Sequence, residues 1–215
     1  MSALYADTHR ELQDRFETRR LADRLEQGIV HDAFADEERA FVESRDMFFL
    51  STVDPEGRPT VSYKGGAPGF VRVEGNGLVF PCYDGNGMFY SMGNATAHPQ
   101  VGLLFIDFET PHRLRVQGEA SLDEGAARDA FPGAQLLVRV RPTQIFVNCS
   151  RYIHRYRKVE ASKYVPDRDG SAPLALWKRI DFIQDSLPDW DRHEVQAAGP
   201  ITQEEYVARV AAGDA

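Results

Sequence analysis

The chain has 215 residues, of which 42% are hydrophobic and 27% charged, close to the average for globular proteins, so composition excludes a disordered or fibrous chain. The 25 Lys and Arg residues against 33 Asp and Glu give a net charge of −8, which argues against a broad basic face for nucleic acid. No stretch approaches the roughly 18 apolar residues of a membrane helix. We therefore expect one domain over residues 1–215, cytoplasmic, with neither nucleic acid nor membrane as a partner.

The N-terminal part is predicted to be a helical extension over residues 1–46. Leu12, Phe16, Leu21 and Leu25 recur at near-helical spacing among many charges, which predicts a first helix within residues 8–27. A second helix is predicted after Asp36, a residue type that caps helix N-termini.

From Met47 the pattern changes to short strands separated by turn residues. Two hairpins are predicted, 48–53 with 58–66 and 69–73 with 78–83, followed by a short helix that ends before Pro99. Further strands are predicted over 100–108, 113–122 and 134–148, with a short helix in 123–133. The hairpin order favours a mainly β fold with added helices, an antiparallel barrel of six to seven strands over 47–150, rather than a doubly wound parallel sheet.

The C-terminal part, residues 151–215, is predicted to be loop and helices. A helix is expected from about Leu174 to Ser186. A final helix opens at Thr202, because Thr202 and Glu205 have the spacing of a capping box.

The first candidate site is the strand that contains Ser62, Tyr63 and Lys64, followed by Gly65. Alternation places Ser62 and Lys64 on one polar face, where Lys64 can donate to an anionic or carbonyl oxygen of a flat ligand. The alternative is a solvent-facing lysine before a bulged turn.

The second candidate is the Gly/Asn-rich loop 84–89, which leads into the short helix. Exposed backbone N–H groups and the helix dipole suit an anion such as a terminal phosphate. The loop has neither a dinucleotide fingerprint nor a P-loop, so an ordinary turn is the alternative.

Basic residues form two further candidates. Arg113 and Arg115 lie two residues apart on one side of a predicted strand, as ordinary surface strands also arrange them. Residues 151–157 concentrate Arg151, Tyr152 and further basic side chains within an acidic protein, typical of an anion contact, a dimer interface or a solvated loop.

Motifs of hydrolases and metal sites are missing from the sequence. There is no nucleophile elbow and no HExxH, and the six histidines lack metal-ligand spacing. Cys82 and Cys149 are interpreted as reduced, buried packing residues rather than catalytic thiols. We expect no metal and can name no catalytic residue.

The order of these motifs is more informative than any one of them. Residues 49–66, 78–105 and 113–120 together resemble the pyridoxamine 5'-phosphate oxidase-like flavin-binding family, and the resemblance extends over roughly residues 40–160. It implies a split β-barrel homodimer that holds FMN in two equivalent clefts at the subunit interface. It also implies an oxidoreductase that transfers hydride or electrons to or from a small molecule.

The resemblance also implies which residues bind the cofactor. The strand along the flavin ring contributes Ser62, Tyr63, Lys64 and Gly65. The loop near the ribityl chain and phosphate contributes Asn86, Gly87 and Met88, and Asn94 matches the asparagine at the end of the short helix. Tyr152 and Trp177 resemble residues that cover the ring from the partner chain.

This sequence departs from the family pattern at the phosphate loop, which contains Asp84 and no basic residue. Either the protein binds FMN weakly, or the positive charge comes from Arg113, Arg115 or the basic residues of 151–157, which include Arg151. The departure leaves open a deazaflavin- or haem-binding protein, or a non-enzymatic module that stores flavin. The C-terminal tail offers only Arg192 and His193 for a vitamin B6 phosphate, so we do not expect vitamin B6 chemistry.

Overall fold

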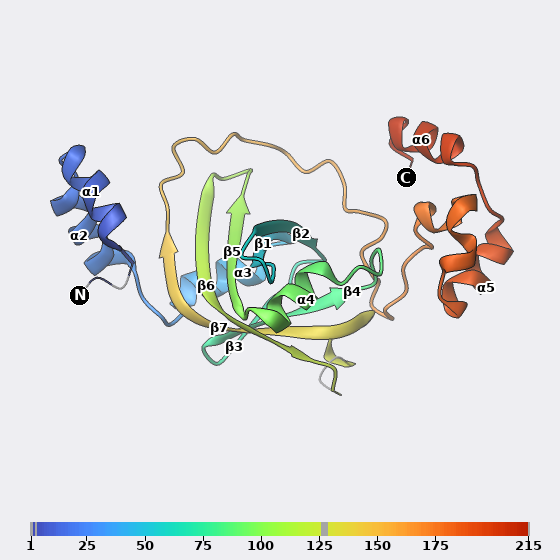
Figure 1. Cartoon of the computed structure of the whole chain (residues 1–215), viewed down its shortest axis with the longest axis horizontal. Helices are drawn as coiled ribbons and strands as arrows, with labels where there is room; N and C mark the ends of the chain where they lie inside the picture. Colours follow the sequence, from blue (N-terminus) through green and yellow to red (C-terminus); the bar gives the residue numbers. More distant parts are fainter. Residues whose placement is uncertain (1, 3, 126–128, 215) are drawn as a thin grey trace. The chain divides into compact units, whose positions relative to one another are not determined.

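The computed structural model describes residues 2, 4–125 and 129–214. The chain divides into two compact units, Met1–Val159 and Glu160–Ala215 (Figure 1). The first unit ends nine residues beyond the predicted end of the barrel core at 150. That the two units act as a single domain stays a prediction.

The N-terminal extension contains three helices among the described residues, α1 (Asp7–Arg15), α2 (Arg19–Ile29) and α3 (Asp36–Glu43). The prediction of one helix within 8–27 was wrong, because the chain turns between α1 and α2. Glu17 has a φ of 55°, a left-handed conformation that a right-handed helix cannot continue through. The amide of Thr18 donates to Gln13 O over 2.8 Å and closes this turn.

The first unit is built on a seven-stranded sheet in which every pair of neighbouring strands is antiparallel. The strand order is β2-β1-β5-β6-β7-β4-β3, so four strands separate β2 from β4. The predicted split barrel with flanking helices is confirmed. The strands are β1 (Met47–Val53), β2 (Pro59–Gly65), β3 (Arg72–Glu74), β4 (Gly77–Tyr83), β5 (Gln100–Asp107), β6 (His112–Asp123) and β7 (Ala134–Val147).

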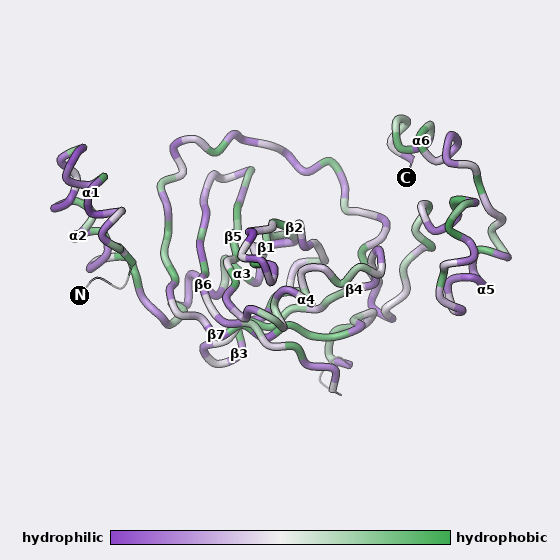
Figure 2. Tube along the Cα trace, viewed as in Figure 1, coloured by the Kyte–Doolittle hydropathy of each residue, from purple (hydrophilic) through white to green (hydrophobic). Residues whose placement is uncertain are grey.

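The barrel core is aromatic at its centre. Phe48 is completely buried, and its ring centroid lies 4.9 Å from that of Phe80, 5.1 Å from that of Phe105 and 5.9 Å from that of Phe70. Hydrophobic residues recur along the strands (Figure 2), and on β1 buried and half-buried residues alternate. Because of this alternation, the buried side chains all lie on one face of the sheet, which packs against the core.

Two long strands approach each other closely at Gly118. The pairing of β6 with β7 shifts register between Gln117 and Gly118, and a Cβ on Gly118 would lie 2.5 Å from Arg141 O. Only glycine permits this approach.

The short helix predicted before Pro99 is present as α4 (Tyr90–Ala97), packed against β1 and β6. Its buried Asn94 donates from Nδ2 to Thr52 Oγ1 over 3.2 Å, and Thr52 Oγ1 lies 2.9 Å from Thr60 Oγ1. These bonds hold α4 on the hairpin of β1 and β2. The short helix predicted within 123–133 lies partly outside the described residues.

The second unit contains two short 3-10 helices, η2 (Leu176–Arg179) and η3 (Asp181–Ser186), in place of the predicted helix 174–186. Ile180 between them is extended because the backbone on either side of it is hydrogen-bonded to Ile201. The amide of Ile201 donates to Arg179 O over 2.8 Å, and the amide of Asp181 donates to Ile201 O over 2.9 Å. The helix α5 (Asp189–Ala198) was not predicted.

The predicted C-terminal helix is confirmed as α6 (Gln203–Ala211). Thr202 Oγ1 accepts a hydrogen bond from the amide of Glu205 over 3.2 Å. In turn, the carboxylate oxygen Oε2 of Glu205 accepts a hydrogen bond from the amide of Thr202 over 2.9 Å. This is the predicted capping box. No helix among the described residues has the length and apolar character needed to cross a membrane.

Candidate functional site

A cavity of about 310 Å³ lies in the first unit, between β2, β4, the loop 84–89 and α4. It brings together two predicted candidates, the polar face of β2 and the Gly/Asn-rich loop. Its walls come from Ser62, Lys64, Cys82, Tyr83, Gly85, Asn86, Gly87, Met88, Phe89, Tyr90, Ser91, Met92 and Gln135.

The wall contributed by β2 follows from its alternation. Ser62 and Lys64 are half-buried and line the cavity, whereas Val61 and Tyr63 are 69% and 63% exposed on the opposite face. Burial lowers the pKa of the Lys64 ammonium, although the nearby Cys82 opposes this shift. The side-chain ammonium of Lys64 has no hydrogen-bond or ion-pair partner among the described residues, so a partly desolvated cation remains available in the cavity.

The loop 84–89 is shaped by Asn86 and two left-handed residues. Asn86 Oδ1 accepts from the Met88 amide over 3.1 Å, an Asx turn. Gly87 has a φ of 73° and Phe89 a φ of 47°. A left-handed phenylalanine is strained, and such strain gathers at ligand sites.

Phe89 is also the N-cap residue of α4, and no side chain caps the first turn of this helix. The unpaired amides at a helix N-terminus and its dipole favour negative charge. The geometry therefore offers amide donors at one end of the cavity and the Lys64 cation on β2.

The first turn of α4 is fastened to the β1–β2 hairpin by two polar contacts. Ser91 Oγ donates to Ser62 Oγ over 3.2 Å, and Tyr90 Oη donates to Asp54 Oδ2 over 3.4 Å. Asp54 is buried and also accepts from Arg58 Nε over 2.6 Å. Burial alone would raise the pKa of Asp54, but the hydrogen bonds and charge of Arg58 hold it below its usual value.

The opposite wall comes from Cys82, Tyr83 and Gln135, none of which was predicted as a site residue. Burial raises the pKa of Cys82 and of Tyr83, which keeps both side chains neutral. Gln135 Nε2 donates to Asp84 Oδ1 over 3.1 Å and joins β7 to the loop. Cys82 is half-buried as a packing residue would be, but Cys149 is exposed just after β7, so its predicted burial was wrong.

The predicted site residues separate into two groups. Ser62, Lys64, Asn86, Gly87 and Met88 meet at the cavity. The others do not line it: Tyr63 and Gly65 belong to the outer side and end of β2, and Asn94 ties α4 to β1. A Cβ on Gly65 would lie 2.7 Å from the Tyr63 ring, so this glycine makes room for Tyr63.

The predicted basic residues also lie outside this cavity. Arg113 and Arg115 are on β6, where the buried Nε of Arg113 has no hydrogen-bond partner among the described residues. Arg151 is exposed in the segment after β7. Trp177 is half-buried in the second unit, with Lys178 Nζ 5.9 Å from its ring centroid. A role for these four residues in cofactor binding stays a prediction.

Three further lining residues that were not named as cofactor-binding residues, Tyr90, Ser91 and Met92, directly follow the predicted loop. The sequence feature that could have indicated them is the junction of a glycine-rich loop with a helix. At such a junction, side chains of the first helical turn can line a site formed by the loop. Among the described residues there is no group of three His, Cys, Asp or Glu side chains able to hold a metal ion.

The curled antiparallel sheet with a cavity between β2, β4 and α4 defines a split-barrel protein with a ligand-sized pocket. The model of a family described as "Pyridoxamine 5'-phosphate oxidase" matches residues 34–168, which include every residue that lines the cavity. The chain belongs to the pyridoxamine 5'-phosphate oxidase family.

Solved structures with a similar fold include HupZ of Group A Streptococcus, 17% identical, with 53% of this chain and 93% of that chain covered and a TM-score of 0.44. The heme storage protein HutZ from Vibrio cholerae is 23% identical, with 54% and 94% covered and a TM-score of 0.41. An FMN-binding protein from Syntrophomonas wolfei is 11% identical, with 64% and 97% covered and a TM-score of 0.40.

Proposed function

We propose that this protein binds FMN in the cavity between β2, β4 and α4 and acts as a flavin-dependent oxidoreductase on a small molecule. The observation that carries the proposal is Lys64. Its ammonium is partly buried in a cavity with aromatic and thioether walls and has no hydrogen-bonding partner among the described residues. A desolvated cation favours a ligand with an electron-rich polar edge.

The residues fit the ring of a flavin. Met88, Phe89 and Met92 offer apolar surface for a flat heterocycle, while Ser62 and Lys64 offer polar groups for its edge. The volume of about 310 Å³ lies at the lower end of the roughly 300–1,000 Å³ of small-molecule sites. The cavity of one chain therefore suits the ring better than the whole cofactor.

The phosphate end of the cofactor needs a further source of positive charge. The amides at the N-terminus of α4 offer donors, but Lys64 is the one basic side chain among the described residues of the cavity wall. We propose that two copies of the chain associate and that Arg151, exposed in the segment after β7, approaches the phosphate from the second copy. A guanidinium binds phosphate in bidentate geometry.

The chemistry that FMN supplies when bound is reversible transfer of hydride or electrons. The protein's part is to bind and orient. Lys64 donates to the polar edge of the ring and stabilises negative charge that develops there. Met88, Phe89 and Tyr90 are 68%, 47% and 49% exposed and give a substrate an apolar surface at the ring.

The test is an absorption spectrum of the full chain purified with and without added FMN. We expect bands of oxidised flavin, release of FMN on denaturation, and bleaching by NAD(P)H that air reverses. Bleaching with dithionite alone indicates a storage protein. A Soret band indicates haem, and a colourless protein that does not take up FMN overturns the proposal.

The contribution of Arg151 from a second copy can be tested by mixing two variants. Lys64→Ala and Arg151→Ala are each expected to lose flavin. After unfolding and refolding together, mixed pairs contain one cleft with both defects and one intact cleft, so flavin binding should return to about a quarter of the wild-type amount. If Arg151 acts within its own chain, mixing restores nothing, because each cleft keeps one defect.

A further inference from the structure

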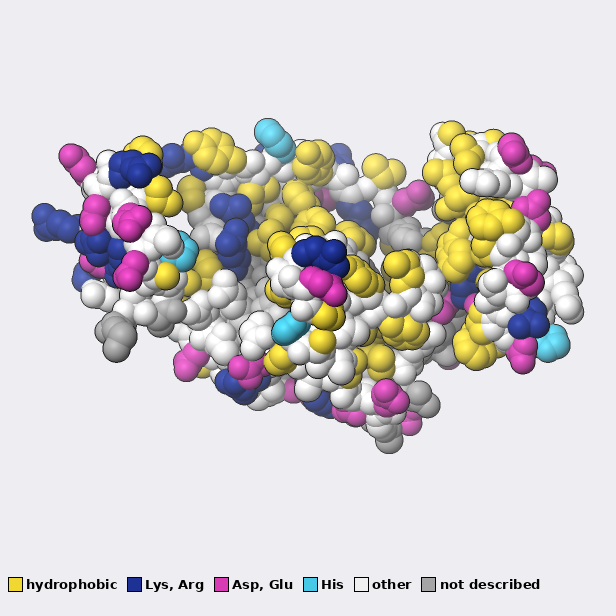
Figure 3. All heavy atoms as spheres, viewed as in Figure 1, with side chains coloured by type: hydrophobic (Ala, Val, Ile, Leu, Met, Phe, Trp, Pro, Cys, Tyr) yellow, Lys and Arg dark blue, Asp and Glu magenta, His cyan; other side chains and the backbone are white. Residues whose placement is uncertain are grey.

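A thioether lies exposed in the wall of the cavity. Met88 lines the cavity and is 68% exposed, and Figure 3 shows hydrophobic side chains at the surface around α4 and the loop before it. The other methionines among the described residues are shielded, since Met47 is half-buried at the start of β1 and Met92, in α4, is 3% exposed. In the described part of the chain, Met88 is therefore the thioether most accessible to a dissolved oxidant.

The side chain of Asn86 makes two hydrogen bonds to Met88. Its Oδ1 accepts from the Met88 amide over 3.1 Å, and its Nδ2 donates to the Met88 sulfur over 3.2 Å. Chemistry determines which atom faces which partner, because a backbone amide N–H only donates and a thioether only accepts. The carboxamide of Asn86 therefore bridges the backbone and the sulfur of one residue.

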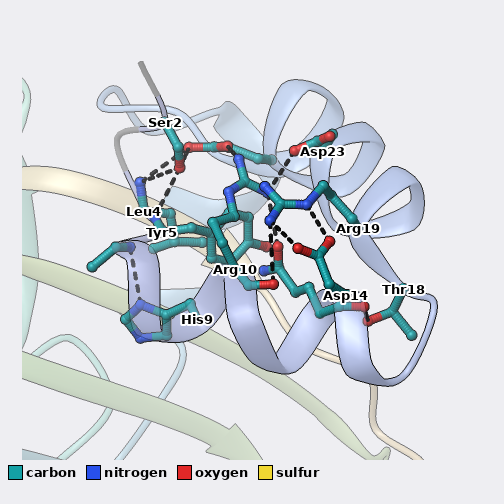
Figure 4. Close-up of polar contacts among 12 residues, drawn as sticks. Ser2, Leu4, Tyr5, His9, Arg10, Asp14, Thr18, Arg19 and Asp23 are labelled. Atoms are coloured by element: carbon teal, nitrogen blue, oxygen red, sulfur yellow. Dashed lines mark hydrogen bonds and ion pairs between the residues drawn. The ribbon is translucent and has the colours of Figure 1, made fainter.

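Two hydrogen bonds between one pair of residues hold a side chain in one orientation. The same arrangement joins α1 and α2, where Arg19 donates through Nε and Nη2 to the two carboxylate oxygens of Asp14 (Figure 4). At Met88 the bridge restricts rotation of the side chain. One lone pair of its sulfur accepts from Asn86 Nδ2, and the other lone pair lies on the side away from Asn86.

We infer that Met88 is a site of stereoselective oxidation to methionine sulfoxide by hydrogen peroxide, with Asn86 shielding one lone pair of its sulfur. The unshielded lone pair attacks one oxygen of the peroxide. A sulfur–oxygen bond forms, the oxygen–oxygen bond breaks, and the second oxygen leaves with both protons as water. The sulfur loses two electrons and the peroxide gains them. Because the sulfur of a sulfoxide is chiral, attack from one side produces one epimer.

Oxidation at this position changes the wall of the cavity. A sulfoxide is polar where the thioether is apolar, and Met88 is one of the residues that offer apolar surface to a flat ring. This consequence rests on the proposed function, which also supplies the oxidant, since a reduced flavin releases hydrogen peroxide when oxygen reoxidises it. We expect the oxidised protein to bind FMN several-fold more weakly, and a methionine sulfoxide reductase to restore the affinity.

The test is treatment of the purified full chain with hydrogen peroxide, followed by digestion with chymotrypsin and mass spectrometry. Chymotrypsin cleaves after aromatic residues and so separates Met88 from Met92 at Phe89 and Tyr90. We expect sulfoxide to form at Met88 about tenfold faster than at Met92, because oxidation follows exposure. The peptide with position 88 is then incubated with each class of methionine sulfoxide reductase, and the two classes act on opposite epimers. One class should reduce nearly all of the product and the other almost none.

Asn86→Asp is the variant that isolates the contact to sulfur. It keeps an oxygen that accepts from the Met88 amide and removes the N–H group that faces the sulfur. Hydrogen peroxide is uncharged, so the added negative charge does not repel it. We expect this variant to form the two epimers in about equal amounts. Gln117→Glu makes the same change of carboxamide to carboxylate on β6, at an exposed residue away from the cavity wall, and should keep the single epimer.

Three results would overturn the inference: equal rates at Met88 and Met92, equal amounts of both epimers from the unaltered chain, or a single epimer from Asn86→Asp. Circular dichroism of each variant checks that the fold is retained. The FMN content of the same samples reports the proposed function separately. Failure to take up FMN, with the selectivity for one epimer intact, would count against the flavin proposal and support the oxidation site.

Discussion

Lys64→Ala is expected to weaken FMN binding by ten- to a hundredfold. The side chain supplies the basic group of the described cavity wall, and hydrogen bonds to charged groups contribute about 1.5–3 kcal/mol, which corresponds to that range of affinity. The dissociation constant is measured by quenching of flavin fluorescence as the protein is titrated. Lys64→Met keeps most of the side-chain volume and should lose nearly as much, which separates charge from packing.

Arg141→Ala is the matched control for loss of one positive charge. Arg141 is exposed on β7 and forms an ion pair with Glu119 over 2.6 Å, away from the cavity wall. Its replacement should change FMN affinity less than twofold. Wild-type affinity in Lys64→Ala, with its circular dichroism unchanged, would show that the flavin ring does not lie against β2.

Phe48→Ala is expected to lower the free energy of unfolding by about 3–5 kcal/mol. Phe48 is completely buried and contacts three aromatic rings of the core, those of Phe70, Phe80 and Phe105. The substitution leaves a cavity that this packed cluster cannot close. Urea denaturation should show a lower midpoint with an unchanged slope.

The neighbouring residue provides the comparison. Phe49 is half-buried on the other face of β1, and its ring centroid lies 6.2 Å from that of the exposed Tyr63. Phe49→Ala should therefore cost clearly less than half of the loss at Phe48. Equal losses at the two positions would contradict the assignment of the core to one face of β1.

The local parts of the fold could be predicted from the sequence because short-range chemistry determines them. The turn 54–57 between β1 and β2 contains Asp, Pro and Gly, and Asp54 Oδ1 accepts from the amides of Glu56 and Arg58 over 3.0 and 2.8 Å. The capping box at Thr202 is equally local. Such signals predicted six to seven strands, of which the structure has seven among the described residues, and the end of α4 before Pro99.

The errors arose where contacts between distant residues decide the conformation. Ile180 interrupts a helical pattern because it pairs with Ile201, which periodicity within 174–186 does not reveal. The break at Glu17 is stabilised by backbone bonds at the end of α1 and by the ion pair of Arg19 with Asp14, although the apolar spacing runs through it.

The candidate site was predicted in two halves. The sequence indicated Lys64 and the loop 84–89 separately, each from its own residue types. Their convergence depends on curvature of the whole sheet, and Gln135 comes from a third strand. Residues of β6 such as Arg113 were predicted to bind the phosphate because of their charge. Charge alone does not specify which side of a barrel a residue faces.

The strand order has a consequence for folding. The walls on β2 and β4 are separated by β1, β5, β6 and β7, so the cavity exists only once every one of these strands is in place. A bound ligand therefore stabilises the complete barrel and no intermediate that lacks a strand. Ligand concentration should raise the unfolding temperature of the whole first unit as one cooperative transition.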